Sequence, residues 1–356
     1  MDVPGSDRIA SMRGIANTHQ CFTCTDSTTS RPGCHNNTCG LMSSNPVTQE
    51  SGLGELAQDV LAIHSTHGSK LGPMVKVPQF LFSCAPSFLA QKGLPNNVQG
   101  ALGLGLSPIS LPNQLFSHFG LKRQFSTCLS RYPTSNGAIL FGDINDPNNN
   151  NYIHNSLDVL HNLVYTPLTI SKQGEYFMQV NAIRVNKHLV IPTKNPFMIP
   201  SSSSSYQESS EIGGTLITTT HPYTVLHHSI FEIFTQVFAS NMPKQAQVKA
   251  VGPFGLCYDS KKISGGAPNV DLIMDRNDAV WRISGENLMV QAQNGVSCLG
   301  FVDGGVHTRA GIALGAHQLE ENLVVFDLAR SRVGFNSNSL KSHGKTCSNL
   351  FDLNNP

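Results

Sequence analysis

Three short groups of residues in this sequence have the types and spacing for chemistry. One combines cysteines with histidines, which can hold zinc as thiolate and imidazole ligands or close disulfides. Another is a run of three hydroxyl side chains followed by a histidine. The third is a glycine-rich stretch of the kind that can approach a phosphate. Each group also has a plainer structural interpretation, and the surrounding elements decide between the two.

The cysteine group lies in a polar, loop-like stretch near the N-terminus, where its C-x2-C spacing is compatible with zinc. Its members are His19, Cys21, Cys24, Cys34, His35 and Cys39. The chain has nine cysteines, and the other five are dispersed, a usage typical of an oxidising compartment. We therefore predict loop disulfides for these four cysteines and no metal. The sequon Asn36-Asn37-Thr38 predicts N-glycosylation of Asn36.

The run of three hydroxyl side chains is Thr218-Thr219-Thr220. It follows a short apolar segment and precedes an amphipathic segment at 229–238. A strand that delivers a loop and then a helix commonly positions catalytic residues, but this loop has hydroxyls where a working site would have a carboxylate. Nearby His221, His227 and His228 could serve zinc binding or catalysis. We favour packing or solvent exposure for all three histidines.

The glycine-rich stretch contains Gly100, Gly103 and Gly105. It lacks the G-x-G-x-x-G spacing of a dinucleotide loop, and no strand–helix–strand pattern surrounds it. We predict a backbone crossing that requires small residues, and we expect no cofactor.

Length and composition indicate a globular protein of about two domains, at roughly 150 residues each. The chain has 356 residues, of which 13% are charged, and a formal net charge of +1. This balance gives no case for nucleic acid or an anionic membrane as a partner. No stretch approaches the roughly 20 apolar residues of a membrane helix.

Many short apolar segments with turn signals between them predict a mainly β protein. The turn-rich run 145–151 is the expected boundary between two domains. We expect an unmatched extension at 1–14, a first domain at 15–150 and a second at 151–356.

The order of the motifs resembles the plant pepsin-like aspartic proteases over about 16–351. The motifs of the first lobe are Phe80-Leu81-Phe82-Ser83-Cys84, the segment 100–115, Phe125-Ser126-Thr127-Cys128-Leu129 and the segment 137–142. Those of the second lobe are Tyr165-Thr166-Pro167-Leu168, Leu256-Cys257-Tyr258, Val296-Ser297-Cys298-Leu299-Gly300 and the segment 324–335. The resemblance implies a bilobal fold of two β-barrel-like lobes with a cleft between them.

Within that family, the chain is most similar to the basic 7S globulins and gamma conglutins of legume seeds, with the xylanase inhibitors and extracellular dermal glycoproteins. The motifs that indicate this subgroup are the segment 16–21, Arg131-Tyr132-Pro133-Thr134-Ser135 and the segment 318–327. The subgroup implies a binding or storage protein of the seed or cell wall. Inhibition of microbial glycoside hydrolases such as xylanase or xyloglucanase, or binding of small peptides, is the implied activity, and an oligomer is compatible with it.

Aspartic proteases use two carboxylates that share one proton, each from an Asp-Thr/Ser-Gly turn. No such turn occurs here; Asp26-Ser27-Thr28 and Asp259-Ser260-Lys261 lack the glycine. The family pattern places Thr218 at the second catalytic position. Asn45-Pro46-Val47-Thr48 occupies the position of the flap, the segment that covers the cleft in the family, but lacks the tyrosine expected there. We predict an inactive relative of the aspartic endopeptidases, with endopeptidase activity as the alternative.

The resemblance also implies two disulfides, Cys257–Cys298 within the second lobe and Cys128–Cys347 between the lobes, and leaves Cys84 as an orphan. It places the first catalytic motif before the cysteine group, where this chain has no match, so we expect a truncated first lobe. The N-terminus has no signal-peptide pattern. The family nevertheless implies an extracellular or seed storage location.

Overall fold

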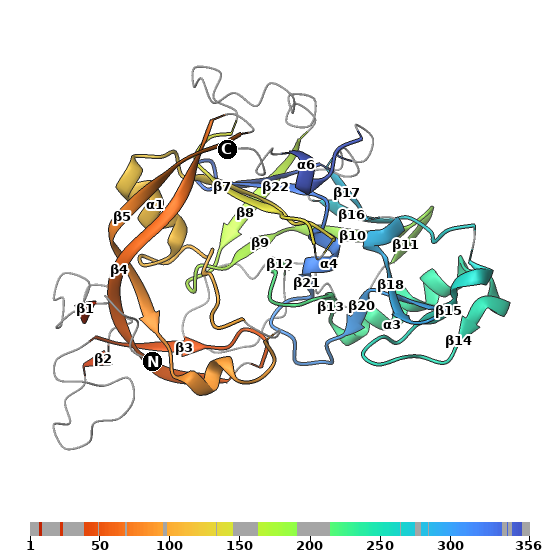
Figure 1. Ribbon diagram of the computed structural model, residues 1–356. Helices are drawn as coiled ribbons and strands as arrows, with labels where there is room; N and C mark the ends of the chain where they lie inside the picture. Colours follow the sequence, from red (N-terminus) through yellow and green to blue (C-terminus); the bar gives the residue numbers. More distant parts are fainter. Residues whose placement is uncertain are drawn as a thin grey trace. The chain divides into compact units, whose positions relative to one another are not determined.

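The computed structural model describes residues 7–8, 22–23, 39–48, 50–67, 70–94, 98–132, 134–144, 163–190, 214–263, 265–274, 279–283, 285–336, 340 and 344–350. Backbone contacts divide the chain into two compact units. The first contains residues 1–66 and 71–121, and the second contains residues 67–70 and 122–356. Figure 1 labels their elements, and most of them are strands.

The first unit is built on a long hairpin, β4 (Ser51–His67) and β5 (Lys70–Cys84). The strands β3 (Cys39–Ser44), β1 (Asp7–Arg8) and β2 (Phe22–Thr23) complete its sheet in the order β1-β4-β3-β2. Leu41 and Leu56 form a small core, against which the half-buried Leu81 and Ile109 pack. The sequence pattern predicts strands at 55–63 and 75–82. Both are confirmed, as parts of β4 and β5, and both extend further.

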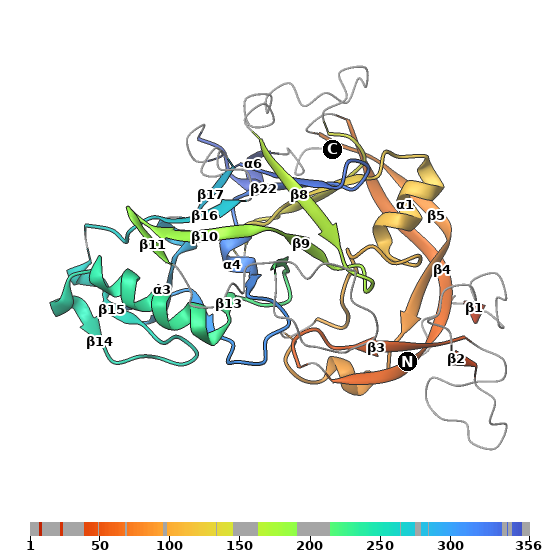
Figure 2. The ribbon, with the colours of Figure 1, turned by 180° about the vertical axis from the view of Figure 1, so that it is seen from behind.

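Helix α1 (Leu111–Phe119) lies beside β5 in both ribbon views (Figures 1 and 2). Pro112 occupies its first turn, where the missing N–H has no intrahelical partner to lose, and Gly120 ends it with a φ of 63°. The Gln114 side chain fastens the helix to the strand: Leu81 N–H donates to Gln114 Oε1 at 2.8 Å, and Gln114 Nε2 donates to Leu81 O at 2.9 Å.

The second unit contains a ten-stranded sheet in the order β20-β13-β21-β12-β9-β8-β23-β22-β6-β7. Its strands are β6 (Gln124–Cys128), β7 (Ala138–Phe141), β8 (Val164–Ile170), β9 (Tyr176–Met178), β12 (Thr215–Ile217), β13 (Thr224–Leu226), β20 (Phe301–Asp303), β21 (Ile312–Leu314), β22 (Leu323–Asp327) and β23 (Arg332–Phe335). Most residues of β6, β22 and β23 are buried, as expected for strands covered on both faces.

Strands β6 and β7 belong to the second unit because β6 pairs with β22, with Phe125 opposite Phe326. The disulfide Cys128–Cys347 fastens the end of β6 to helix α6 (Cys347–Leu350), so both of its cysteines lie in one unit rather than joining two. The predicted domain boundary after residue 150 falls outside the described residues.

Two four-stranded sheets and helix α3 (His228–Ser240) complete the second unit. One sheet joins β11 (His188–Val190), β10 (Val180–Val185), β16 (Val270–Met274) and β17 (Val280–Ile283); the other joins β14 (Gln247–Val248), β15 (Cys257–Asp259), β19 (Val296–Leu299) and β18 (Met289–Gln293). Cys257 and Cys298 form a disulfide between β15 and β19. Both disulfides of the described residues are the pairs that the resemblance implied.

Helix α3 buries Ile230, Phe234 and Phe238, which are spaced four residues apart and share one face. The sequence pattern predicts that Phe231, Phe234, Val237 and Phe238 form the core face of this helix. This is confirmed for Phe234 and Phe238, whereas Phe231 and Val237 are only partly buried. The chain's single tryptophan, Trp281 in β17, is fully buried and stacks on Phe335 with ring centroids 4.5 Å apart.

The sequence pattern predicts one continuous strand at 176–185 and another at 297–302, but each is interrupted in the structure. The segment 176–185 breaks at Gln179 into β9 and β10, which join different sheets, and the segment 297–302 breaks at Gly300 into β19 and β20. A Cβ at Gly300 would lie 3.1 Å from the Gln318 side chain, so a larger residue there would have to displace that neighbour by a few tenths of an ångström. No helix among the described residues is long and apolar enough to cross a membrane.

Candidate functional site

The three threonines follow β12, near the centre of the ten-stranded sheet. Strand β12 runs parallel to β21 and antiparallel to β9. Thr218 N–H continues the parallel pairing by donating to Leu314 O at 3.1 Å. The sequence therefore predicted the local arrangement correctly: a short buried strand delivers these hydroxyls at its carboxyl end.

The hydroxyls of this loop bind one another. Thr218 Oγ1 lies 2.8 Å from Thr220 Oγ1 and accepts from Thr220 N–H at 3.1 Å. Thr218 and Thr220 are half-buried, whereas Thr219 is exposed. A hydroxyl pair of this kind has no group that ionises near neutral or acid pH, so it cannot exchange a proton as a carboxylate dyad does.

The end of the loop is hydrogen-bonded to the start of the short helix α4 (Ala316–Leu319). Ala316 N–H donates to His221 O at 2.8 Å, and His317 N–H donates to Pro222 O at 3.0 Å. A Cβ at Gly315 would lie 2.4 Å from the backbone of Tyr223, so only glycine permits this approach. Burial lowers the pKa of His221, because it disfavours the charged imidazolium.

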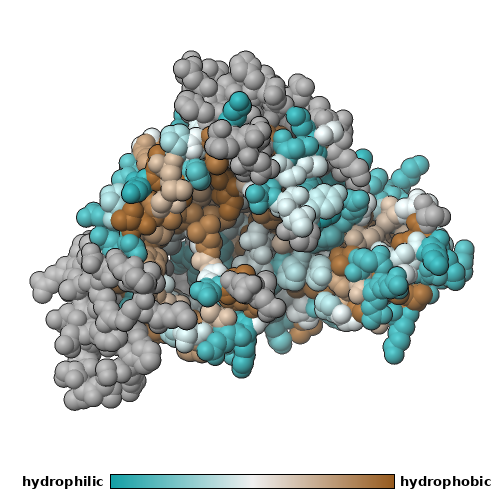
Figure 3. All heavy atoms as spheres, in the orientation of Figure 1, coloured by the Kyte–Doolittle hydropathy of each residue, from teal (hydrophilic) through white to brown (hydrophobic). Residues whose placement is uncertain are grey.

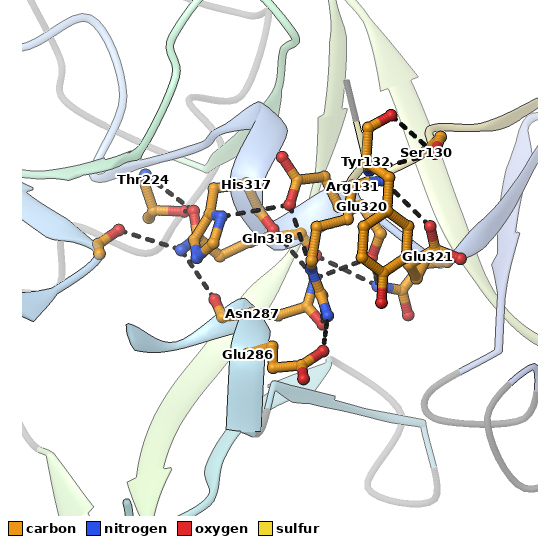
Figure 4. A network of polar contacts seen from close by, with 12 residues as sticks. Ser130, Arg131, Tyr132, Thr224, Glu286, Asn287, His317, Gln318, Glu320 and Glu321 are labelled. Atoms are coloured by element: carbon orange, nitrogen blue, oxygen red, sulfur yellow. Dashed lines mark hydrogen bonds and ion pairs between the residues drawn. The ribbon is translucent and has the colours of Figure 1, made fainter. Parts of the chain in front are cut away.

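Beneath the loop, Gln318 and Thr224 form a buried polar pair (Figure 4). Gln318 Oε1 accepts from Thr224 N–H at 2.9 Å and from Thr224 Oγ1 at 2.7 Å. Gln318 Nε2 donates to Asn287 O and to Gly300 O, both at 3.0 Å. Thr224 Oγ1 also accepts from Gly315 N–H at 3.1 Å. Every polar atom of the Gln318 amide is thus engaged.

Arg131 is the centre of an adjoining cluster of acidic and amide side chains (Figure 4). Its Nη1 pairs with Glu286 and its Nη2 donates to Asn287 Oδ1 at 2.7 Å, both residues being in the short helix η4 (Gly285–Asn287). Its Nε lies 3.5 Å from Glu320 Oε2, which also contacts His317 Nδ1 at 3.2 Å. The Arg131 side chain is only 19% exposed, so solvent screens these contacts incompletely.

Glu321 links this cluster to Cys347, one of the two cysteines of the Cys128–Cys347 disulfide. Its carboxylate accepts from Arg131 N–H at 3.0 Å and from Cys347 N–H at 2.8 Å, and its own N–H donates to Leu129 O at 2.8 Å. Its φ of 53° shows that the backbone is in the left-handed region to make these contacts. The motifs that begin at Arg131 and Gln318 were singled out in the sequence, but their contact with each other was not foreseen.

The remaining histidines have structural contacts. His227 precedes α3, and its Nδ1 accepts from Ser229 N–H at 3.2 Å as a helix cap. His228 Nδ1 lies 2.7 Å from Asp303 Oδ2 and its Nε2 lies 3.5 Å from Glu232. The hydrogen bond to Asp303 raises the pKa of His228, with smaller contributions from the charges of Asp303 and Glu232.

Other acidic and flap residues singled out in the sequence also have structural roles. Asp259 caps the short helix η3 (Ser260–Lys262) by accepting from Lys261 N–H at 3.0 Å. In the flap segment, the buried Asn45 donates from Nδ2 to Leu89 O at 2.7 Å and accepts from Val47 N–H at 2.8 Å. This turn is therefore fixed through an asparagine.

The glycine prediction is wrong for Gly100 and Gly103, because a Cβ at either position would meet no described atom within 4 Å. Cys84 ends β5, and its predicted orphan state stays a prediction. Within the described residues, no three His, Cys, Asp or Glu side chains form a group that could hold a metal ion. Asp26, Cys21, Cys24, Cys34 and Asn36 lie outside the described residues, and the side chain of Cys39 does too.

Comparison with known sequences agrees with this geometry. The family described as "Xylanase inhibitor N-terminal" matches residues 10–143, and the family described as "Xylanase inhibitor C-terminal" matches residues 175–337. The chain therefore belongs to the xylanase-inhibitor family of aspartic-protease-like proteins. Among its relatives, gamma conglutin 1 of Lupinus angustifolius is 91% identical over 341 residues, which are 96% of this chain and 76% of that protein.

Other relatives have different names. Basic 7S globulin of Glycine max is 63% identical over 96% of this chain and 77% of that protein. A probable aspartic proteinase of Nicotiana benthamiana is 37% identical over 90% of this chain and 74% of that protein. The chain is thus a close homologue of the gamma conglutins and basic 7S globulins, as the sequence motifs indicated.

Solved structures confirm the fold class. The crystal structure of conglutin gamma from lupine seeds superposes with a TM-score of 0.88 and 83% identity, over all of this chain and 87% of that one. Basic 7S globulin from soybean gives a TM-score of 0.83 and 58% identity, over 99% of this chain and 87% of that one. The mainly β, pepsin-like bilobal class predicted from the sequence is therefore confirmed.

We expect Arg131→Ala to lower the free energy of unfolding by about 1–3 kcal/mol, because Asn287, Glu286 and Glu320 lose a charged donor in a partly buried site. Denaturant titration followed by the fluorescence of Trp281 would measure it. The matched control is Arg309→Ala: Arg309 pairs with Glu175 at 2.7 Å but is 68% exposed. The control should lower the free energy of unfolding by less than about 1 kcal/mol. An equal loss in the two variants would contradict the stabilising role given to the Arg131 contacts.

We expect Asp303→Asn to lower the pKa of His228 toward its ordinary value, because the main cause of the upward shift is removed. A group whose folded-state pKa is raised adds stability at pH values below its unfolded pKa, and that stability is lost as pH rises through the folded pKa. The variant should therefore melt below the wild type in acid and converge with it in alkali.

The pKa itself can be read from an NMR titration of the His228 ring. Glu232→Gln is the control, since Glu232 lies farther from the ring and contributes only through its charge. A His228 pKa that stays raised in Asp303→Asn would disprove the role of Asp303.

Proposed function

We propose that this protein is a non-catalytic member of the aspartic-protease-like proteins, which acts by binding in the seed or cell wall. Its role is storage together with inhibition of microbial glycoside hydrolases such as xylanase or xyloglucanase. The observation that carries the proposal is Thr218 at the carboxyl end of β12, where the family's second catalytic carboxylate belongs.

The chemistry of the loop supports a lack of proteolysis. Two carboxylates must share a proton so that one activates water while the other protonates the substrate. Thr218 is instead hydrogen-bonded to Thr220. A carboxylate contributed from elsewhere in the protein would therefore find no second carboxylate in this loop with which to share a proton. The alternative, an aspartic endopeptidase, has support in the name of the Nicotiana relative but not in these side chains.

The hydrogen bonds that hold this loop support a binding role. The loop is fixed by α4, and α4 is fixed by the buried Gln318 amide and the Arg131 cluster. Surfaces that hold one conformation lose little entropy on association, which favours tight binding. The match to the xylanase-inhibitor family favours glycoside hydrolases as the partners, with small peptides as a second class.

The proposed location is extracellular, in the cell wall or a seed storage compartment. The disulfides Cys128–Cys347 and Cys257–Cys298 support an oxidising environment. The seed origin of the related conglutin gamma structure supports storage in the seed.

We expect purified protein to show no pepstatin-sensitive cleavage of denatured haemoglobin at acid pH, because general acid–base catalysis by the dyad is absent. Thr218→Ala should behave identically, since the threonine performs no chemistry. A wild type that cleaves while Thr218→Ala does not would assign catalysis to this loop and disprove the proposal. Cleavage that is equal in both and insensitive to pepstatin would identify a contaminating protease.

Titration of a fungal xylanase and a xyloglucan-specific endoglucanase tests the binding role. We expect native protein to inhibit at least one of them, with inhibition that saturates near one protein per enzyme. Protein that has been reduced and heated should not inhibit. Full activity of both enzymes at a large excess of native protein would remove inhibition from the proposal and leave storage alone.

A further inference from the structure

Exposed lysines gather at one end of the second unit, around β14, β15 and the short helices next to them. Five lysines are exposed there: Lys187, Lys244, Lys249, Lys261 and Lys262. Figure 3 shows hydrophilic side chains, with hydrophobic ones between them, at this end of the molecule, on the right of the view. We call these five residues the lysine surface.

Hydrogen bonds and strand pairing bring four of these lysines together from two segments. Lys262 Nζ, in η3, donates at 3.5 Å to the carbonyl of Gln245, the neighbour of Lys244 in η2 (Lys244–Ala246). Strand β14 pairs with β15, with Val248 opposite Cys257. Lys249 directly follows Val248, so it lies at the end of this strand pair.

The turn that carries Lys187 joins the same end of the unit. Asn186 Nδ2 donates to Asn241 Oδ1 at 3.3 Å, which holds the turn between β10 and β11 against the end of α3. Asn241 lies three residues before Lys244 in the sequence.

The charge of this surface differs sharply from that of the whole chain. Segment 233–270 contains four lysines and one aspartate. The acidic residues that flank it are Glu232, in α3, and Asp271, which is buried and paired with Arg184 and Arg282. The aspartate, Asp259, caps η3 and lies 3.9 Å from Lys262. The positive charges therefore face solvent with little local compensation.

The residue types select the kind of anion. The segment contains no arginine, which is the side chain suited to bidentate contacts with phosphate. Its aromatic residues, Phe234, Phe238, Phe254 and Tyr258, are buried, so none is available to stack on a nucleic-acid base. The lysine ammonium is a compact, hydrated charge on a flexible stem, which suits a polymer with one carboxylate on each repeating unit.

We propose that the lysine surface binds acidic polysaccharide of the polyuronate class. This interaction goes beyond the inhibitory role, because it requires neither a glycoside hydrolase nor the loop that follows β12. It would hold the protein in a carboxylated polysaccharide matrix while the rest of the second unit stays accessible.

The test is titration of the purified protein with polygalacturonate at low ionic strength. Combining Lys244→Gln, Lys249→Gln, Lys261→Gln and Lys262→Gln should weaken binding roughly tenfold or more and flatten its dependence on salt. The same four positions changed to arginine should keep the affinity, because the charge is kept. If the arginine variant binds as weakly as the glutamine variant, charge is not the cause and the proposal fails.

The matched control combines Lys70→Gln, Lys76→Gln, Lys92→Gln and Lys172→Gln, which are exposed elsewhere and change the net charge equally. It should bind as the wild type does; an equal loss would show attraction by net charge alone and overturn the proposal. Fully methyl-esterified polygalacturonate should not bind. Duplex DNA or phosphatidylserine vesicles that bind as tightly as polygalacturonate would overturn the assignment to polyuronate.

Discussion

The buried side-chain amide of Gln318 is the interaction on which the site in the second unit depends. An amide removed from water must have its hydrogen bonds satisfied, or it costs several kcal/mol. Gln318 meets this demand by joining β13, η4 and the break between β19 and β20 to α4. Helix α4 in turn holds the backbone at His221 and Pro222. The position of the threonine loop therefore depends on Gln318, which lies about 100 residues later in the chain.

Local patterns predicted the parts of the fold that local physics decides. The amphipathic segment that forms α3 and the short strand that leads to Thr218 both follow from neighbouring residues. The breaks at Gln179 and Gly300 were missed. Gln179 falls in an alternating pattern that is typical of one continuous strand, and the close neighbours of Gly300, Leu288 and Gln318, are distant from it in sequence.

The Arg131 cluster shows why most of the site could not be predicted. Arg131, Asn287 and Glu320 are more than 30 residues apart from one another in sequence, and nothing near any of them identifies its partners. Family motifs marked two of the three segments as unusual without showing that they touch. The net charge was similarly uninformative, since a total near zero conceals an acidic cluster around Arg131 and a basic surface around β14.

The pairing of β6 with β22 has a consequence for synthesis of the protein. Phe125 lies opposite Phe326, 201 residues later, so β6 leaves the ribosome long before its neighbour in the sheet exists. Contacts of such long range are slow to form, and an apolar strand without its partner is prone to associate with other chains. The second unit therefore cannot complete its largest sheet until β22 has been synthesised, about 200 residues after β6.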